Sequence, residues 1–202
     1  AYTNLKKMCV EESITLNVAT QFAWHKLLQS YSADDATIVG TTVSGRDVPV
    51  EGIEASVGLY INTLPLLIDW SDASRSIRNV FKTIQQDIAD LNTHSAISLA
   101  KLQRDGERLF HSLFVFENYP MPEGNAQATG IERNLKVRAG IEKVDYPLSV
   151  TVFEENSSLI IKLGHSEDWL SSNDAFELLK KFNQILARIA EDTSASALTL
   201  NI

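Results

Sequence analysis

The sequence has one cysteine, no long apolar run and no strong basic cluster, and each absence excludes a class of protein. Cys9 alone cannot form an internal disulfide and is too little for a thiolate-rich metal site. No apolar stretch approaches the roughly 20 residues that cross a bilayer. A net charge of −8 argues against nucleic acid as the main partner. The first residues also lack the apolar core of a secretory signal, so a reducing cytoplasm is the simplest location.

Common catalytic motifs are missing as well. The sequence contains neither a glycine-rich phosphate loop nor a paired-cysteine motif. The histidines are His25, His94, His111 and His165. Sequence places none of them against a partner and an orienting group, as general-base chemistry requires. We expect His25 at the surface or boundary of an amphipathic helix, and His165 in a solvated connection. We therefore assign no catalytic residue and no metal ligand.

What is present is a well-patterned globular chain, 202 residues long and 44% apolar. Leu5, Met8 and Cys9 have helical spacing, and Thr15 can cap a second helix. The apolar, β-branched run at 36–43 predicts a buried strand. A second strand is predicted at 59–68, where Pro65 lacks an amide hydrogen. That strand should therefore lie at an edge or carry a bulge.

The rest of the chain alternates between segments with the helical spacing of apolar residues and segments with the spacing of a strand. A helix is predicted around 77–91 with Ser71 or Asp72 as its cap, and a last helix follows Ser171 or Ser172 with Phe176 on its buried side. Further strands are predicted at 112–118, 131–137, 147–153 and 159–164, the last two joined by a hairpin turn. The order ααββαββββα predicts one α/β domain over 1–202, a sandwich with a mixed sheet.

Two segments place polar groups where binding sites are common. GTTVSGR (40–46) puts the hydroxyl of Ser44 and the guanidinium of Arg46 after a buried strand, and loops at strand ends often carry function. The alternative, which the residues alone favour, is a turn with Arg46 in a surface ion pair. Asn62 lies within an apolar strand, so its amide is either structurally bonded or directed into a cavity. Both alternatives stay open.

These segments resemble, in the same order, the later core motifs of condensation domains from non-ribosomal peptide synthetases. Tyr60 stands where that family usually has Phe. The VFENYP stretch favours a condensation domain over the related epimerisation domain. The matching segments cover nearly the whole chain and lie at 17–32, 39–46, 51–68, 112–120 and 145–152.

The resemblance implies the C-terminal member of a V-shaped pair of chloramphenicol-acetyltransferase-like lobes. A tunnel between the lobes admits phosphopantetheine arms from two carrier proteins, and the downstream aminoacyl amine attacks the upstream acyl or peptidyl thioester. Ser44, Arg46 and Asn62 are carried over as tunnel-facing, and loops near 47–57 and 119–131 as crossing to the other lobe. The implied partners are that N-terminal lobe, the carrier proteins and an adjacent adenylation domain. No cofactor is bound directly.

The departure from the family is the missing His-His-x-x-x-Asp-Gly signature of its N-terminal half. No two histidines are adjacent in this sequence. We expect an expressed fragment, inactive alone, that exposes more apolar surface than an ordinary monomer and associates with itself. The alternatives are an epimerisation lobe, a hydrolase using His165, or a carrier-docking module. The last would use a basic patch, although a solvated strand face is the commoner explanation for Arg133, Lys136, Arg138 and Lys143.

Overall fold

The computed structural model describes residues 2–46, 50–103, 107–117 and 145–200. The helices are α1 (Tyr2–Glu11), α2 (Leu16–Ser32), α3 (Ile77–Thr93), α4 (Leu99–Leu102) and α5 (Ser172–Ile189). The strands are β1 (Ala36–Val43), β2 (Asn62–Asp69), β3 (Ser112–Glu117), β4 (Leu148–Glu155) and β5 (Ser158–His165). A single 3₁₀ turn, Ile53–Ala55, precedes β2 in the described part of the chain. The predicted strand at 131–137 lies outside the described residues.

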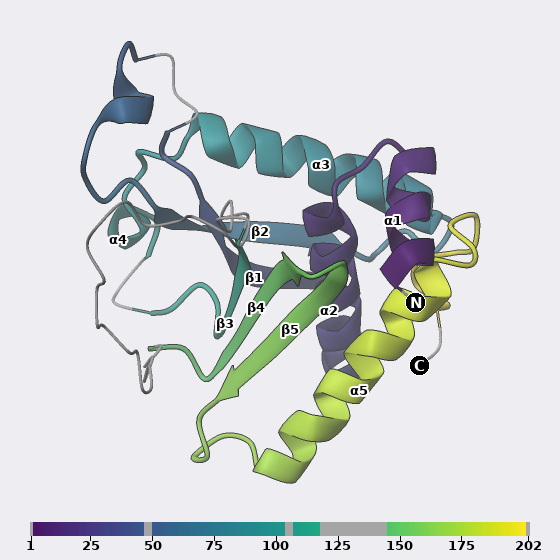
Figure 1. The fold of residues 1–202 in the computed structure, drawn as a ribbon. Coiled ribbons are helices and arrows are strands. Elements are labelled where there is room, and N and C mark those ends of the chain that lie inside the picture. Colours follow the sequence, from purple (N-terminus) through teal and green to yellow (C-terminus); the bar gives the residue numbers. More distant parts are fainter. Residues whose placement is uncertain (1, 47–49, 104–106, 118–144, 201–202) are drawn as a thin grey trace, which may run out of the picture.

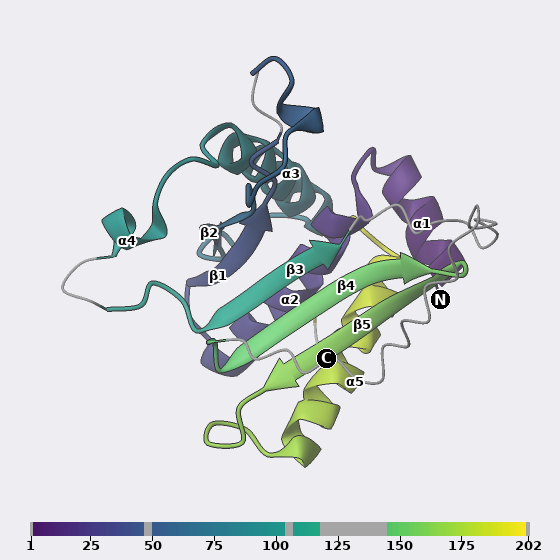
Figure 2. The ribbon, with the colours of Figure 1, turned by 60° about the vertical axis from the view of Figure 1, so that its left-hand side comes forward.

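The described strands form one mixed sheet, which confirms the predicted α/β class. Their order is β2-β1-β3-β4-β5. The pairs β1–β3 and β3–β4 are parallel, whereas β1–β2 and β4–β5 are antiparallel. Figure 2 shows the sheet with the long helices behind it and its opposite face toward the viewer. The chain crosses from edge strand β2 through α3 to β3 on the far side of β1, so β1 lies inside the sheet.

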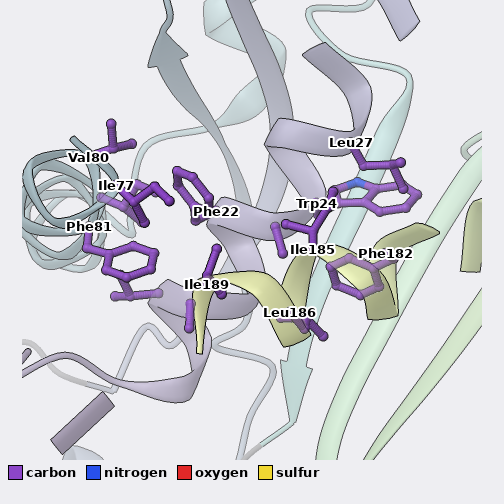
Figure 3. Packing of buried hydrophobic residues seen from close by; sticks show 14 of the residues in the cluster. Phe22, Trp24, Leu27, Ile77, Val80, Phe81, Phe182, Ile185, Leu186 and Ile189 are labelled. Atoms are coloured by element: carbon purple, nitrogen blue, oxygen red, sulfur yellow. The ribbon is translucent and has the colours of Figure 1, made fainter. Parts of the chain in front are cut away.

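Helix α2 is the centre of the helical layer (Figure 1). It contacts α3 on one side and α5 on the other, and β1 lies beneath it. Figure 3 shows the aromatic contacts that join these helices: Phe22 of α2 meets Phe81 of α3 edge-to-face at 5.1 Å, and Trp24 meets Phe182 of α5 at 5.6 Å. All four rings are at most 1% exposed, so Trp24 is a packing residue. Edge-to-face contacts add directional attraction to the burial of area.

Hydrogen bonds at the helix starts confirm two predicted caps and correct a third. The hydroxyl of Thr15 accepts a bond from the amide of Val18, and Ser171 accepts one from Asp174. The cap of α3 is Ser76, so the prediction of Ser71 or Asp72 was wrong. Residues 70–75 turn before the helix begins, and the Asp72 carboxylate bonds Ser74 instead.

The prediction for the last helix was wrong at one position. Phe176 is 64% exposed, while Phe182, Ile185 and Ile189 of the same helix are buried. Ala175 and Leu178, in the same first turns of the helix, are buried, so Phe176 is exposed because it lies on the face of α5 turned away from the core.

The predictions for β2 and for the hairpin are confirmed. β2 is an edge strand of the described sheet, with Pro65 opposite Gly40. The hairpin between β4 and β5 turns through Asn156 and Ser157, which have φ values of 48° and 58°. Two left-handed residues suit a tight hairpin because their twist matches that of the strands.

His25 is fully buried, so its predicted surface or boundary position was wrong. It lies between α2 and β1, where its Nδ1 is 2.8 Å from the hydroxyl of Thr37. Trp70 donates to the same hydroxyl at 2.9 Å. One turn earlier, Gln21 donates to Thr41 of β1. Because α2 is covered on several sides, its polar residues form a buried seam that helical amphipathicity does not reveal.

Candidate functional site

A pocket of about 310 Å³ lies at the carboxyl ends of the parallel strands β1 and β3. Two of the three predicted site residues, Ser44 and Arg46, line it. Ile61 closes it on the side of β2, and the outer residues of β3 complete it. The other lining residues are Thr42, Val43, Val115, Phe116 and Glu117. The pocket thus joins a hydroxyl and a guanidinium to apolar walls, which is the usual composition of a ligand site.

Arg46 is bonded to the loop that follows it. Its Nη1 donates to the carbonyl oxygens of Ile53 at 2.8 Å and Ser56 at 2.9 Å. Its guanidinium also stacks on the ring of Tyr60, 4.4 Å from the ring centre. The Tyr60 hydroxyl is in turn hydrogen-bonded to Ser56. Through these contacts Arg46 clamps the backbone of the loop that follows it.

Gly45 allows this clamp to close. Its amide donates to the carbonyl oxygen of Tyr60 at 3.1 Å. A Cβ at position 45 would lie 2.3 Å from that oxygen, so only glycine permits the two backbones to approach. Sequence reasoning missed Tyr60 and Ser56 as partners of Arg46. The only signal in the sequence for this contact was the Ser-Gly-Arg turn at 44–46 with an aromatic residue, Tyr60, later in the same loop.

The loop before β2 exposes apolar side chains next to this pocket. Val57 and Leu59 are 101% and 91% exposed, and Val50 and Ile61 are more than half exposed. Single exposed apolar residues are ordinary, but this loop of twelve residues, 50–61, exposes four of them. Such a feature is typical of a surface that another body covers.

Asn62, the third predicted residue, is not part of the pocket. Its Nδ2 donates to the carbonyl oxygens of Ser95 at 2.8 Å and Ile97 at 2.6 Å, while its Oδ1 accepts from the amide of Thr63 at 2.8 Å. The Asn62 amide was expected either to be structurally bonded or to point into a cavity, and these bonds show that it is structurally bonded. They tie the start of β2 to the segment after α3.

The histidines do not assemble a catalytic group in the part of the chain described. His165 is the half-buried last residue of β5, opposite Leu148, so its predicted place in a solvated connection was wrong; its Nδ1 is 3.1 Å from the carbonyl oxygen of Leu170. His111 lies 6.1 Å from the Trp169 ring, and His94 ends α3. Among these residues no group of three metal-binding side chains occurs, and no helix is long and apolar enough to span a membrane.

Several predicted features lie outside the described residues. They are the basic patch of Arg133, Lys136, Arg138 and Lys143, the loop at 119–131, and positions 47–49 of the first loop. These remain predictions.

Comparison with known sequences identifies a family over almost the entire chain. The family model described as "Condensation domain" matches residues 2–202. N-(5-amino-5-carboxypentanoyl)-L-cysteinyl-D-valine synthase of Amycolatopsis lactamdurans is 34% identical over 98% of this chain, and bacitracin synthase 1 of Bacillus licheniformis is 28% identical over 99%. The chain spans only 6% and 4% of the length of these two synthases.

Solved structures agree on the fold. A four-domain nonribosomal peptide synthetase bound to AMP and glycine superposes with a TM-score of 0.82 at 17% identity over 99% of this chain, and 16% of its own chain is covered. The first condensation domain of the CDA synthetase gives 0.74 at 15% identity, with 99% of this chain and 45% of that chain covered. The family match over residues 2–202 and the shared fold lead to one conclusion: the chain belongs to the condensation-domain family.

Proposed function

We propose that this chain is the C-terminal lobe of a peptide-synthetase condensation domain and forms one wall of its substrate tunnel. The whole domain would join a carrier-bound acyl or peptidyl thioester to a carrier-bound aminoacyl thioester. The attacking amine forms the amide bond, and the upstream phosphopantetheine thiol leaves. The chemistry requires both thioesters to be held within attack distance, which one lobe cannot do alone.

The observation that carries this proposal is the pocket at the end of β1 with its exposed apolar loop. Val57 and Leu59 are almost completely exposed beside a pocket lined by Ser44 and Arg46. A second lobe placed against this end would bury the loop and turn the open pocket into part of a tunnel. The chain covers 45% of a solved condensation domain, which also supports a half of the domain.

The side chains divide into two roles within this proposal. Ser44 is exposed at the pocket and would meet the substrates or their pantetheine arms. Arg46 and Asn62 would act as positioning residues: Arg46 fixes the loop at 50–61, and Asn62 fixes the start of β2. No cofactor would be bound directly, because carrier proteins present the arms. An adjacent adenylation domain would load the downstream carrier, and the location would be the cytoplasm.

The missing histidine pair makes the proposal testable. A single-turnover assay with two loaded carrier proteins would be run on this chain, on a separately produced N-terminal lobe, and on their mixture. We expect peptide only in the mixture, because the second histidine of His-His-x-x-x-Asp-Gly belongs to the N-terminal lobe. A mixture whose N-terminal lobe has both histidines changed to alanine is the matched control and should be silent.

Each contrary outcome has a definite meaning. Peptide formed by this chain alone would overturn the inactive-half proposal. Peptide formed equally well by the histidine-to-alanine mixture would overturn the assigned chemistry. Inversion of the upstream residue without peptide formation would identify an epimerisation lobe. If the mixture is silent and analytical ultracentrifugation shows that the lobes have associated, the condensation role is wrong; loaded carrier binding would then favour the docking module.

A further inference from the structure

A second cavity, of about 470 Å³, lies away from the proposed tunnel wall, between β2, α3 and the segment after α3. Figure 1 shows α3 running beside β2. We call this cavity the β2–α3 groove; its lining residues from the strand are Leu64, Pro65, Leu66 and Leu67, those from α3 are Asp87, Asp90 and Leu91, and the rest are His94, Ile97 and Leu102.

The groove presents apolar side chains to solvent. Leu67 is 50% exposed, and Ile97 and Leu102 are each 39% exposed. They come from three separate segments, so the fold brings them together. An apolar groove with converging branched side chains is the shape that accepts one face of a partner helix.

Two carboxylates give the groove its charge preference. Asp87 and Asp90 lie three residues apart on α3 and therefore on neighbouring positions of one helix face. Neither forms an ion pair with another described residue. Burial, together with the nearby charge of Asp90, raises the pKa of Asp87. The cation that acts on Asp87, Arg75, donates its hydrogen bonds to Asp69 and Thr83. A cation from a partner would therefore relieve the repulsion between the Asp87 and Asp90 carboxylates.

The backbone of β2 disfavours a partner that adds as an extra strand. The Trp70 amide donates to the carbonyl oxygen of Asp35, and the Gly45 amide donates to that of Tyr60. In the register of β1 and β2, the even-numbered residues of β2 therefore direct their backbone hydrogen bonds toward β1. The odd-numbered residues then face outward. Of these, Pro65 has no amide hydrogen, and the Thr63 amide already donates to Asn62. An added strand would thus lose two donors, so recognition must rely on side chains.

We propose that the β2–α3 groove docks an amphipathic partner helix that carries aliphatic residues on one face and lysine or arginine beside them. The aliphatic residues fill the space between Leu67, Ile97 and Leu102, and the cation meets Asp87 and Asp90. The surface does not suit acidic carrier proteins, because the groove and the whole chain, with a net charge of −8, are negative. Docking here is therefore separate from the condensation role.

The test uses a designed helical peptide of about 18 residues, long enough to be helical, with leucine on one face and lysine beside it. A second peptide replaces every lysine with glutamate. Affinity for the full chain is measured by fluorescence anisotropy, and the contact site by methyl chemical shifts. The groove variant is D87N/D90N. The matched control is E167Q/D168N, which removes the same charge from the exposed loop after β5.

We expect the lysine peptide to bind the groove variant about tenfold more weakly and the control within about twofold of the unchanged chain. Shifts should concentrate at Leu67, Ile97 and Leu102, and L102S should also weaken binding. Circular dichroism confirms that the variants remain folded. The proposal would be overturned if the lysine peptide does not bind, or if the glutamate peptide binds comparably. It would also be overturned if the groove variant and the control lose affinity equally, or if the chemical shifts are centred elsewhere.

Discussion

At the residue scale, one hydroxyl in the buried seam between α2 and β1 forms hydrogen bonds with two aromatic rings. Thr37 accepts the indole N–H of Trp70 and pairs with Nδ1 of His25. The second ring nitrogen of His25 has no partner among the described residues. Charging this ring would leave a cation without water or a counter-ion, so the neutral form is strongly preferred.

The seam predicts an acid-sensitive fold. Burial lowers the pKa of His25 to about 3, whereas its ordinary value is 6.5. Between these values the unfolded chain binds a proton that the folded chain does not. The free energy of unfolding should therefore fall by about 1.4 kcal/mol per pH unit as pH drops below 6.5, through this residue alone. His25→Gln should reduce that slope in urea titrations between neutral pH and pH 5.

The exposed histidine His111 supplies the control for this measurement. His111→Gln should leave the pH dependence close to that of the unchanged chain. An unchanged slope in His25→Gln would contradict the burial of a neutral imidazole at this position.

Asn62 allows a second test at this scale, which separates a structural amide from one that meets substrate. Asn62→Ala removes the bonds to Ser95 and Ile97 and should cost about 1–2 kcal/mol of unfolding free energy. Asn62→Asp keeps the acceptor for the Thr63 amide, but it places a carboxylate oxygen against the carbonyl oxygens of Ser95 and Ile97. It should therefore cost at least as much unfolding free energy as Asn62→Ala. Amide exchange at Ile97 should rise in both variants. Full stability in Asn62→Ala would contradict the structural role.

At the element scale, capping decides where the helices start. Ser171 both accepts from the Asp174 amide and donates to the Asp174 carboxylate, so it closes the first turn of α5. Ser172 is already inside the helix. Two adjacent serines were equivalent in the sequence, and only the backbone conformation distinguishes them: Ser171 is extended, with φ −69° and ψ 154°.

This difference gives a matched pair of substitutions. Ser171→Ala should lower the free energy of unfolding by about 1 kcal/mol, because an amide of the first turn loses its acceptor. Ser172→Ala should change it by less than about 0.5 kcal/mol, because alanine is favoured inside a helix. Chemical denaturation of both variants checks the prediction, and equal losses would contradict it.

At the scale of the whole molecule, the apolar loop at 50–61 is the feature that the fold leaves uncovered. The helical layer buries one face of the sheet, but Val57 and Leu59 lie beyond it. The Arg46 clamp holds the loop in place, so these side chains cannot fold back onto the core without breaking its bonds.

The isolated chain should therefore associate with itself as concentration rises. V57S/L59S should reduce this association, since it removes the apolar area of the loop. Val10, 74% exposed on α1, provides the control, and Val10→Ser should have little effect. Light scattering after size exclusion checks the result across a wide concentration range. A clean monomer of the unchanged chain throughout that range would contradict the expectation.

By itself, the sequence determined the α/β class, the strand at 36–43 and the cap Thr15. It also limited the strand that contains Pro65 to an edge or a bulge, and the cap of the last helix to Ser171 or Ser172. These follow from local causes: β-branching, the missing amide hydrogen of Pro65, and side-chain oxygens before apolar helical runs. Its motifs also indicated the condensation family, which the comparison with known sequences confirmed.

Only the tertiary structure decided how each residue is used. His25 is buried because α2 lies between α3, α5 and the sheet, and Phe176 is exposed because it lies on the face of α5 turned away from the core. Ser44 and Arg46 meet at one pocket, while Asn62 turns to the segment after α3. Periodicity describes one element at a time, whereas burial and hydrogen-bond partners depend on elements distant in sequence.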